Sequence, residues 1–132
     1  MSVPRPLAKC LFICDDVVSD PVSGKPSILN SWEIVRVPPG AAFPYTLGKI
    51  VIVAQLRGGL GDIRFRVGVV RADDLEPILP SVRPLVNFPD RLTSRWLVGR
   101  FRDVVFPEPG GYLVQLYCEG DFVDDRLITV LE

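Results

Sequence analysis

Histidine is absent from this chain of 132 residues, and there are only 3 cysteines and 1 methionine. Without histidine, the sequence cannot form the Ser-His-Asp or Cys-His pairs that activate the nucleophile in many hydrolases. Most catalytic zinc sites also require histidine ligands. We therefore expect that the protein is not an enzyme and that it carries no cofactor.

The sequence also lacks a strong net charge and any long hydrophobic run. Its formal net charge is −1, with no block of like charge to attract nucleic acid or an anionic membrane. An apolar run such as residues 50–54 is far shorter than the ~20 residues of a membrane-spanning helix. The run 10–14 is too short for the core of a signal peptide. We expect no nucleic-acid partner and no membrane partner.

The few cysteines indicate a reducing compartment. Cys10, Cys14 and Cys118 are odd in number, and no secretion signal precedes them. If Cys10 and Cys14 lie on one strand, their Cα atoms are about 13 Å apart at ~3.3 Å per residue, too far for a disulfide. The sequence therefore predicts three thiols in a cytoplasmic protein.

What the sequence does contain is an alternation of apolar and polar residues with a period of two, which is typical of β-strands. In residues 62–72, Phe65 and Val67 share one face, while Arg64 and Arg66 share the other. The predicted strands are residues 7–14, 28–37, 49–57, 62–72, 94–106, 111–119 and 122–131, with a short one near 82–86. Most of the 13 prolines fall between these strands, where sheets tolerate them. We predict a single all-β domain over residues 1–132, an antiparallel β-sandwich of seven to eight strands.

Two tryptophans and one phase slip specify the predicted core further. Trp32 shares strand parity with Ile28 and Ile34, and Trp96 shares it with Val98, so both tryptophans are expected to be mostly buried. In residues 94–106 the apolar parity changes between Val98 and Phe101. A β-bulge near Gly99 is the predicted cause.

Four segments of the sequence together resemble a known family. They are Cys14-Asp15-Asp16, Gly24 to Ile28, Phe43-Pro44, and Phe106 to Tyr112. The pattern is similar to an uncharacterised family of small bacterial proteins, a domain of unknown function. The resemblance implies an immunoglobulin-like sandwich and supplies no catalytic residues. In such sandwiches a tyrosine placed like Tyr112 often anchors a corner through its hydroxyl, so we expect a structural role for it.

Two classes of function remain open on the sequence alone. The first is a non-catalytic binding or assembly module, acting as a homo-oligomer or with a protein partner. Its predicted partner or anion surface is an arginine cluster, provided that the contributing strands share one sheet: Arg64, Arg66, Arg100 and Arg102. Arginine is suited to this because it grips carboxylate or phosphate with two parallel hydrogen bonds.

The alternative is a calcium-dependent enzyme or binding protein that uses acidic loops. Asp15, Asp16 and Asp20 follow the first predicted strand, and two further acidic pairs lie in or after other strands. Calcium takes six to eight oxygen ligands from converging loops. The spacing of these carboxylates matches no defined calcium loop, and solvated turn residues are their ordinary role.

Overall fold

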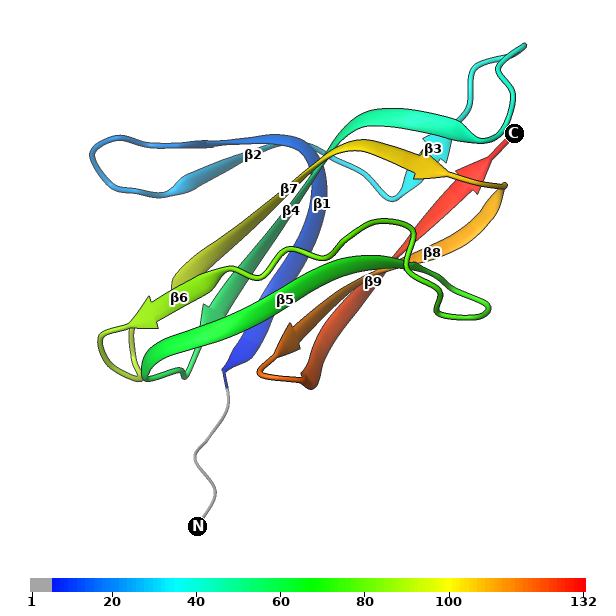
Figure 1. Ribbon diagram of the computed structural model, residues 1–132. Helices are drawn as coiled ribbons and strands as arrows, with labels where there is room; N and C mark the ends of the chain where they lie inside the picture. The colour runs from blue at the N-terminus through cyan, green and yellow to red at the C-terminus, as the bar shows by residue number, and fades with distance from the viewer. Residues whose placement is uncertain (1–5) are drawn as a thin grey trace.

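The computed structural model describes residues 6–132, and within this range the chain is all-β, with nine strands and no helix (Figure 1). The strands are β1 (Leu7–Ser19), β2 (Pro26–Ser31), β3 (Ile34–Arg36), β4 (Tyr45–Arg57), β5 (Gly61–Arg71), β6 (Leu85–Phe88), β7 (Arg95–Phe106), β8 (Gly110–Cys118) and β9 (Asp121–Leu131). The count exceeds the predicted seven to eight because residues 28–37 are two strands. The chain leaves one sheet after Ser31 and enters the other at Ile34.

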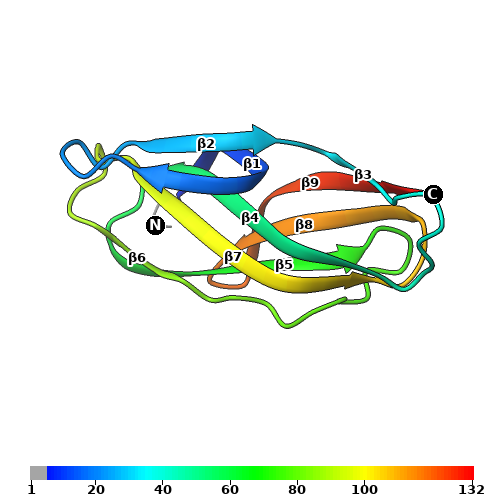
Figure 2. The same cartoon turned by 90° about the horizontal axis from the view of Figure 1, so that it is seen from above.

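The strands form two sheets that face each other (Figure 2). The first sheet has the order β2-β1-β4-β7, and the second has the order β3-β9-β8-β5-β6. Neighbouring strands are antiparallel except for β3, which runs parallel to β9. This single parallel pair arises because the chain crosses between the sheets near Trp32 and continues along the last strand.

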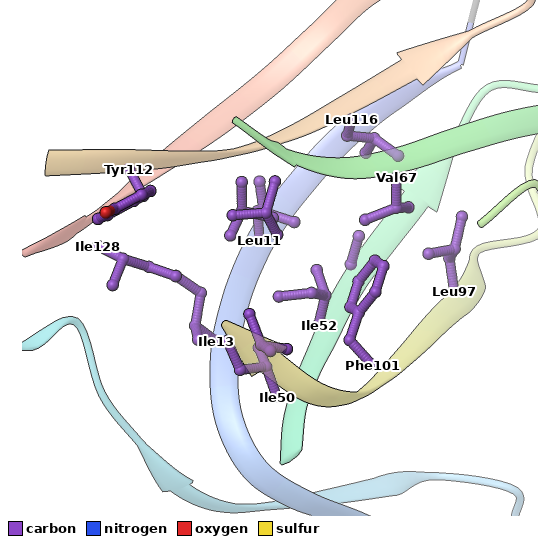
Figure 3. Close-up of a cluster of buried hydrophobic side chains, with 14 of the residues drawn as sticks. Leu11, Ile13, Ile50, Ile52, Val67, Leu97, Phe101, Tyr112, Leu116 and Ile128 are labelled. Atoms are coloured by element: carbon purple, nitrogen blue, oxygen red, sulfur yellow. The ribbon is translucent and has the colours of Figure 1, made fainter. Parts of the chain in front are cut away.

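The main core lies between the two sheets and is apolar, as the period-two pattern predicts. Figure 3 shows Ile50 and Ile52 of β4 pointing toward Val67 of β5 and Leu116 of β8. All four side chains are fully buried. Fully burying one such aliphatic side chain contributes ~1.5–3 kcal/mol, so this cluster dominates the stability of the fold.

Strand β1 bends sharply in its middle, and this bend shapes the first sheet. Its residues up to Cys14 pair with β4, ending at Cys14 opposite Val51, whereas Asp16 to Ser19 pair with β2. The second half of β1 and β2 thus form an arm that leaves the edge of β4 and extends on the outer side of the first sheet (Figures 1 and 2). A second small apolar cluster, which includes Cys14, Val17 and Val51, lies on the side of β4 away from the main core.

The predicted bulge near Gly99 is wrong, because β7 pairs with β4 in one continuous register through Gly99, which lies opposite Ile52, and this corrects the placement of Trp96. Leu97 and Phe101 are buried in the core, and the parity changes only after them, at Asp103, which has a φ of 51°. A residue in this left-handed region interrupts the alternation of a strand. Trp96 and Val98 therefore face away from the main core, and Trp96 is 37% exposed. The prediction of Trp96 as a core residue is wrong.

A candidate binding groove at a strand fork

The four predicted arginines do not form one surface. Arg64 and Arg66 lie on β5 in the second sheet, whereas Arg100 and Arg102 lie on β7 in the first sheet. Each pair points away from the core of its own sheet, as its parity predicts. The sequence indicated which residues face outward, but it could not indicate which strands are neighbours. The single arginine cluster is thus corrected to two separate pairs.

Arg64 and Arg66, the pair on β5, both contact neighbouring groups of the protein. The Nη1 atom of Arg64 donates a hydrogen bond to the carbonyl oxygen of Arg83 at 2.7 Å. The guanidinium of Arg66 lies 4.2 Å from the centre of the Tyr117 ring, in a cation–π contact. These contacts hold the segment after β5 and the outer face of β8, so this pair has a sufficient structural role.

The pair on β7 has a cationic neighbour on β4. Lys49 lies opposite Arg102 in the sheet, and Arg100 lies one step further along β7. We call Lys49, Arg100 and Arg102 the basic patch. Lys49 Nζ lies 3.1 Å from Oδ2 of Asp16 on β1. The hydrogen bond from Lys49, followed by that from the Val17 N–H, lowers the pKa of Asp16 below its ordinary value, and the charge of Arg100 acts in the same direction.

The acidic residues considered for calcium have other roles. Asp15 and Asp16 lie within β1 and not in a loop after it. Asp20 accepts hydrogen bonds from the Val22 N–H and the Ser23 hydroxyl at 2.9 Å each, which closes the β1–β2 turn and lowers its pKa. Across residues 6–132, no three side chains of the metal-ligating types histidine, cysteine, aspartate and glutamate are grouped to hold an ion. The calcium alternative has no geometry to support it in this range.

Tyr112 closes the corner between β7 and β8. Its side chain is 1% exposed, and its hydroxyl donates a hydrogen bond to the carbonyl oxygen of Glu108 at 2.6 Å. The Glu108 N–H in turn donates to the same hydroxyl at 3.3 Å. The ring packs edge-on against Phe106, with centroids 4.9 Å apart. We call this arrangement the closed corner, since each polar group of the hydroxyl has a partner.

The fork between β1 and β4, in contrast to the closed corner, leaves part of a strand edge without a partner. Because β1 departs after Cys14, the edge of β4 that faces away from β7 has no strand partner from Tyr45 to Ile50 within the described ladders. The segment Trp32–Arg36 runs on the other side of this gap. The indole Nε1 of Trp32 donates a hydrogen bond to Oδ1 of Asp15 at 2.9 Å, which fixes the ring at the fork.

A groove of about 210 Å³ lies between this segment and β4. Its lining is mainly apolar and aromatic, with one acidic and one basic residue: Asp15, Trp32, Ile34, Val35, Arg36, Tyr45 and Leu47. Trp32, Tyr45 and Leu47 are partly buried and pack against the main core, so the groove reaches the core from outside. Ile34 is 50% exposed at its rim. We call this site the fork groove.

Sequence reasoning missed the fork groove for two reasons. The predicted strand 49–57 began four residues too late, which left Tyr45 and Leu47 outside it. Residues 28–37 were treated as one strand, so Trp32 was placed in the core together with Ile34. Trp32 is only partly buried, because it lies at the crossing between the sheets. The signal that could have located the crossing is the polar pair Asn30-Ser31, which separates Ile28-Leu29 from Trp32 and Ile34.

Two other hollows are less suited to recognition. One of about 120 Å³ lies beside the closed corner, where Arg71 pairs with Glu108, Asp73 and Asp74. The other, of about 500 Å³, is formed by the loop of residues 37–43 with Glu132. The first is smaller than the fork groove, and its charged side chains are already paired with one another. The second offers one charged side chain and no cluster of polar side chains to orient a ligand.

Comparison with known proteins identifies the family of the chain. The model of a family of unknown function, DUF6941, matches residues 9–131. Since the match covers nearly the whole chain, the protein belongs to this family. No curated protein matches the chain. The predicted membership of a family of unknown function is confirmed, and the function has to be argued from the geometry of the chain itself.

Proposed function

We propose that this member of DUF6941 is a non-catalytic protein-binding module that accepts an extended segment of its partner in the fork groove. The observation that carries the proposal is the edge of β4 from Tyr45 to Ile50, which lacks a strand partner on the side away from β7. Alternate residues of a strand direct their N–H and C=O groups to the same edge. An added strand satisfies these groups, as in other complexes formed by strand addition.

The short strands at the other sheet edges carry features that discourage pairing, and the outer edges of the first half of β1 and of β9 lie close to each other, with Nε of Arg126 donating a hydrogen bond to the carbonyl oxygen of Leu11 at 2.8 Å. β6 is short and lies between Pro84 and Pro89, and β3 has three residues followed by Pro38 and Pro39. β2 begins at Pro26. Proline and short length are common protections of exposed edges. These features favour the β4 edge as the point of attachment.

The outer edge of β7 is long, but the segment that precedes it lies alongside. A Cβ atom placed on Gly99 would meet a methyl group of Val82 at 3.5 Å, so the two residues are close neighbours. Nε of Arg95 donates a hydrogen bond to the carbonyl oxygen of Asn87 at 2.9 Å. The twist at Asp103 interrupts the same edge further along.

The side chains around the fork supply contact area in addition to backbone pairing. Aromatic residues such as Trp32 and Tyr45 are enriched at protein interfaces, where they bury a large surface at low entropic cost. A side chain of the bound segment that enters the groove meets these rings and Leu47. Backbone pairing supplies affinity, and this pocket selects the side chain that fits.

The immunoglobulin-like fold that the sequence resemblance implies is part of this proposal. β1, β4 and β7 correspond in order and sheet to strands A, B and E of that fold, and β5, β8 and β9 correspond to C, F and G. The hydroxyl of Tyr112 bonds back to Glu108 near the start of the strand equivalent to F, which is a hallmark of these domains. Sheet edges and loops of this fold commonly serve recognition.

A bacterial origin, a cytoplasmic location and self-association are further parts of this proposal. A bacterial origin and a cytoplasmic location fit the resemblance and the three unbridged cysteines. No helix within residues 6–132 has the length and apolarity to cross a membrane. A homo-oligomer is one form of the proposed partnership, with a second copy supplying the added segment. Light scattering decides this, because a mass of 14.6 kDa at micromolar concentration means a monomer.

The experiment is a selection of displayed nonapeptides on the purified protein, repeated on two matched variants. Ile34→Lys places a charge at the rim of the fork groove, and Leu127→Lys places the same charge on β9, where the native side chain is also 50% exposed. We expect peptides that bind the wild type and the Leu127→Lys variant but bind Ile34→Lys at least tenfold more weakly. Peptides that bind all three proteins equally, or no enriched peptide at all, would contradict the proposed function.

A further inference from the structure

We propose, resting on the function proposed above, that the fork groove selects an acidic strand, in which apolar side chains alternate with carboxylates. The class of partner is thus an extended protein segment that is apolar on one face and acidic on the other. The two faces of β4 at its open edge differ in chemistry.

One face of the open edge is apolar and leads to the core. Tyr45 and Leu47 turn their side chains to this face, where they and Trp32 pack against the main core. A strand added beside them places every second side chain on the same face, since side chains alternate with a period of two. Those positions require apolar residues, because a charge there would be taken out of water without a partner.

The other face of the open edge is basic. Although Lys49 comes two residues after Leu47, it lies on the face opposite to the buried Ile50, next to Arg102 on the neighbouring strand, because the alternation of β4 shifts at Gly48, across from Asp103 of β7. Arg100 extends this basic patch along β7. The intervening side chains of an added strand emerge on this face, one strand away from Lys49. Among protein side chains, carboxylates are the groups that form charge-assisted hydrogen bonds with these cations.

The chain itself provides an example of the proposed contact. Where β1 still lies near β4, the carboxylate of Asp16 binds Nζ of Lys49 at 3.1 Å. The other charges around the groove are Asp15, which accepts the Trp32 N–H, Arg36 at the rim, and the exposed Asp103. Two of the three carboxylates here are therefore already bonded, whereas the cations outnumber them. A carboxylate of the bound strand would compete with Asp16 for Lys49.

The test uses three capped nonapeptides in which valine alternates with glutamate, glutamine or lysine. Their affinities for the full chain are measured by calorimetry at low salt. We expect the glutamate peptide to bind about fivefold more tightly than the glutamine peptide, the upper range for one exposed ion pair, and the lysine peptide to bind most weakly. High salt should reduce the difference, because screening weakens exposed pairs.

Two variants with a matched control separate the charge effect from a folding defect. Lys49→Glu should reverse the ranking of the glutamate and lysine peptides, whereas Arg64→Glu on the other sheet should leave it unchanged. Asp16→Asn should tighten binding of the glutamate peptide, a gain that misfolding cannot produce. Equal binding of the glutamate and glutamine peptides would overturn this inference and leave the proposed function standing. Binding of both that is unaffected by Ile34→Lys would overturn the proposed function as well.

Discussion

The closed corner and the fork are two aromatic sites that differ in how completely their groups are satisfied. At the corner, Tyr112 is 1% exposed, and its hydroxyl both donates to and accepts from the backbone of Glu108. At the fork, Trp32 is only partly buried, and its N–H is held by the exposed carboxylate of Asp15. The first site therefore leaves no group for a partner, while the second leaves a strand edge and an apolar groove.

This difference indicates where stability and recognition reside in the molecule. Buried, fully bonded groups are costly to disturb and stabilise the native state. Exposed edges and aromatic rings stabilise it less, and they are typical of recognition surfaces. If the contrast is correct, substitutions at the corner should reduce stability, and substitutions at the fork should mainly reduce binding.

The largest expected effect comes from removing the two aromatic rings in turn. Tyr112→Ala should lower the free energy of unfolding by ~3–5 kcal/mol, because it leaves a cavity beside Phe106 in the core. Trp32→Ala should cost roughly half as much, because part of the ring is already in water. Urea denaturation measures both values. A Trp32→Ala variant that is less stable than Tyr112→Ala would contradict the claim that the corner contributes more to stability than the fork.

Removing only the hydroxyl of the corner tyrosine should have a smaller effect. Tyr112→Phe keeps the ring but leaves the backbone groups of Glu108 without their partner, which should cost ~1–3 kcal/mol. The matched change at the fork, Trp32→Phe, removes an exposed hydrogen bond and should cost less than ~1 kcal/mol beyond the loss of ring area. If both variants unfold at the same urea concentration as the wild type, the corner hydroxyl has no structural role.

Thiol reactivity separates the two halves of β1 on either side of the fork. Burial raises the pKa of the Cys14 thiol, with the neighbouring Asp15 carboxylate acting in the same direction, and its side chain is fully buried. Cys10 is partly exposed. Because the thiolate is the reactive form, a disulfide reagent should modify Cys10 in the native protein well before Cys14. After denaturation, three thiols per chain should react, and a count of one would mean an intramolecular bridge.

The pH dependence should have opposite signs at the two sites, although each effect is small. The pKa of Asp16 at the fork is lowered, chiefly by Lys49, so its contribution is complete above about pH 4 and is lost as the pH falls through the folded-state pKa. Burial raises the pKa of Tyr112, so the corner loses stability as the pH rises above about 10.

Denaturation curves of two variants check both directions. Asp16→Asn should have a shallower loss of stability in acid than the wild type, and Tyr112→Phe should have a shallower loss in alkali. If variant and wild type lose stability equally steeply in acid, Asp16 is not responsible for the acid loss. The same result in alkali would contradict the role given to Tyr112.

The parts of this structure that follow from period-two patterning could be predicted, and those that depend on strand pairing could not. The alternation around Phe65 and Val67 correctly separated the core from the outer face, and so did that around Val114 and Leu116. The position of Tyr112 after Pro109 and two glycines indicated a corner. These are local properties, set by which face of a strand contacts the core.

The fork groove depends instead on contacts between segments far apart in the sequence. Asp15 and Asp16 interrupt the alternation, which predicts a strand end at Cys14, but no local signal shows that β1 continues to Ser19 paired with β2 alone. The change of parity at Asp103 could not be predicted for a related reason, since glycine is the more common residue at positive φ. The placement of Arg64 and Arg100 on different sheets likewise required the strand order.

Hydrogen exchange of the backbone amides in β4 tests the central claim most directly. The measurement compares the free protein with its complex with the peptide that binds most tightly in the display selection. We expect that amides within Tyr45–Ile50 that face away from β7 exchange more slowly in the complex, while those of β2 and β6 are unchanged. Slower exchange at β2 or β6, with no change in Tyr45–Ile50, would contradict it.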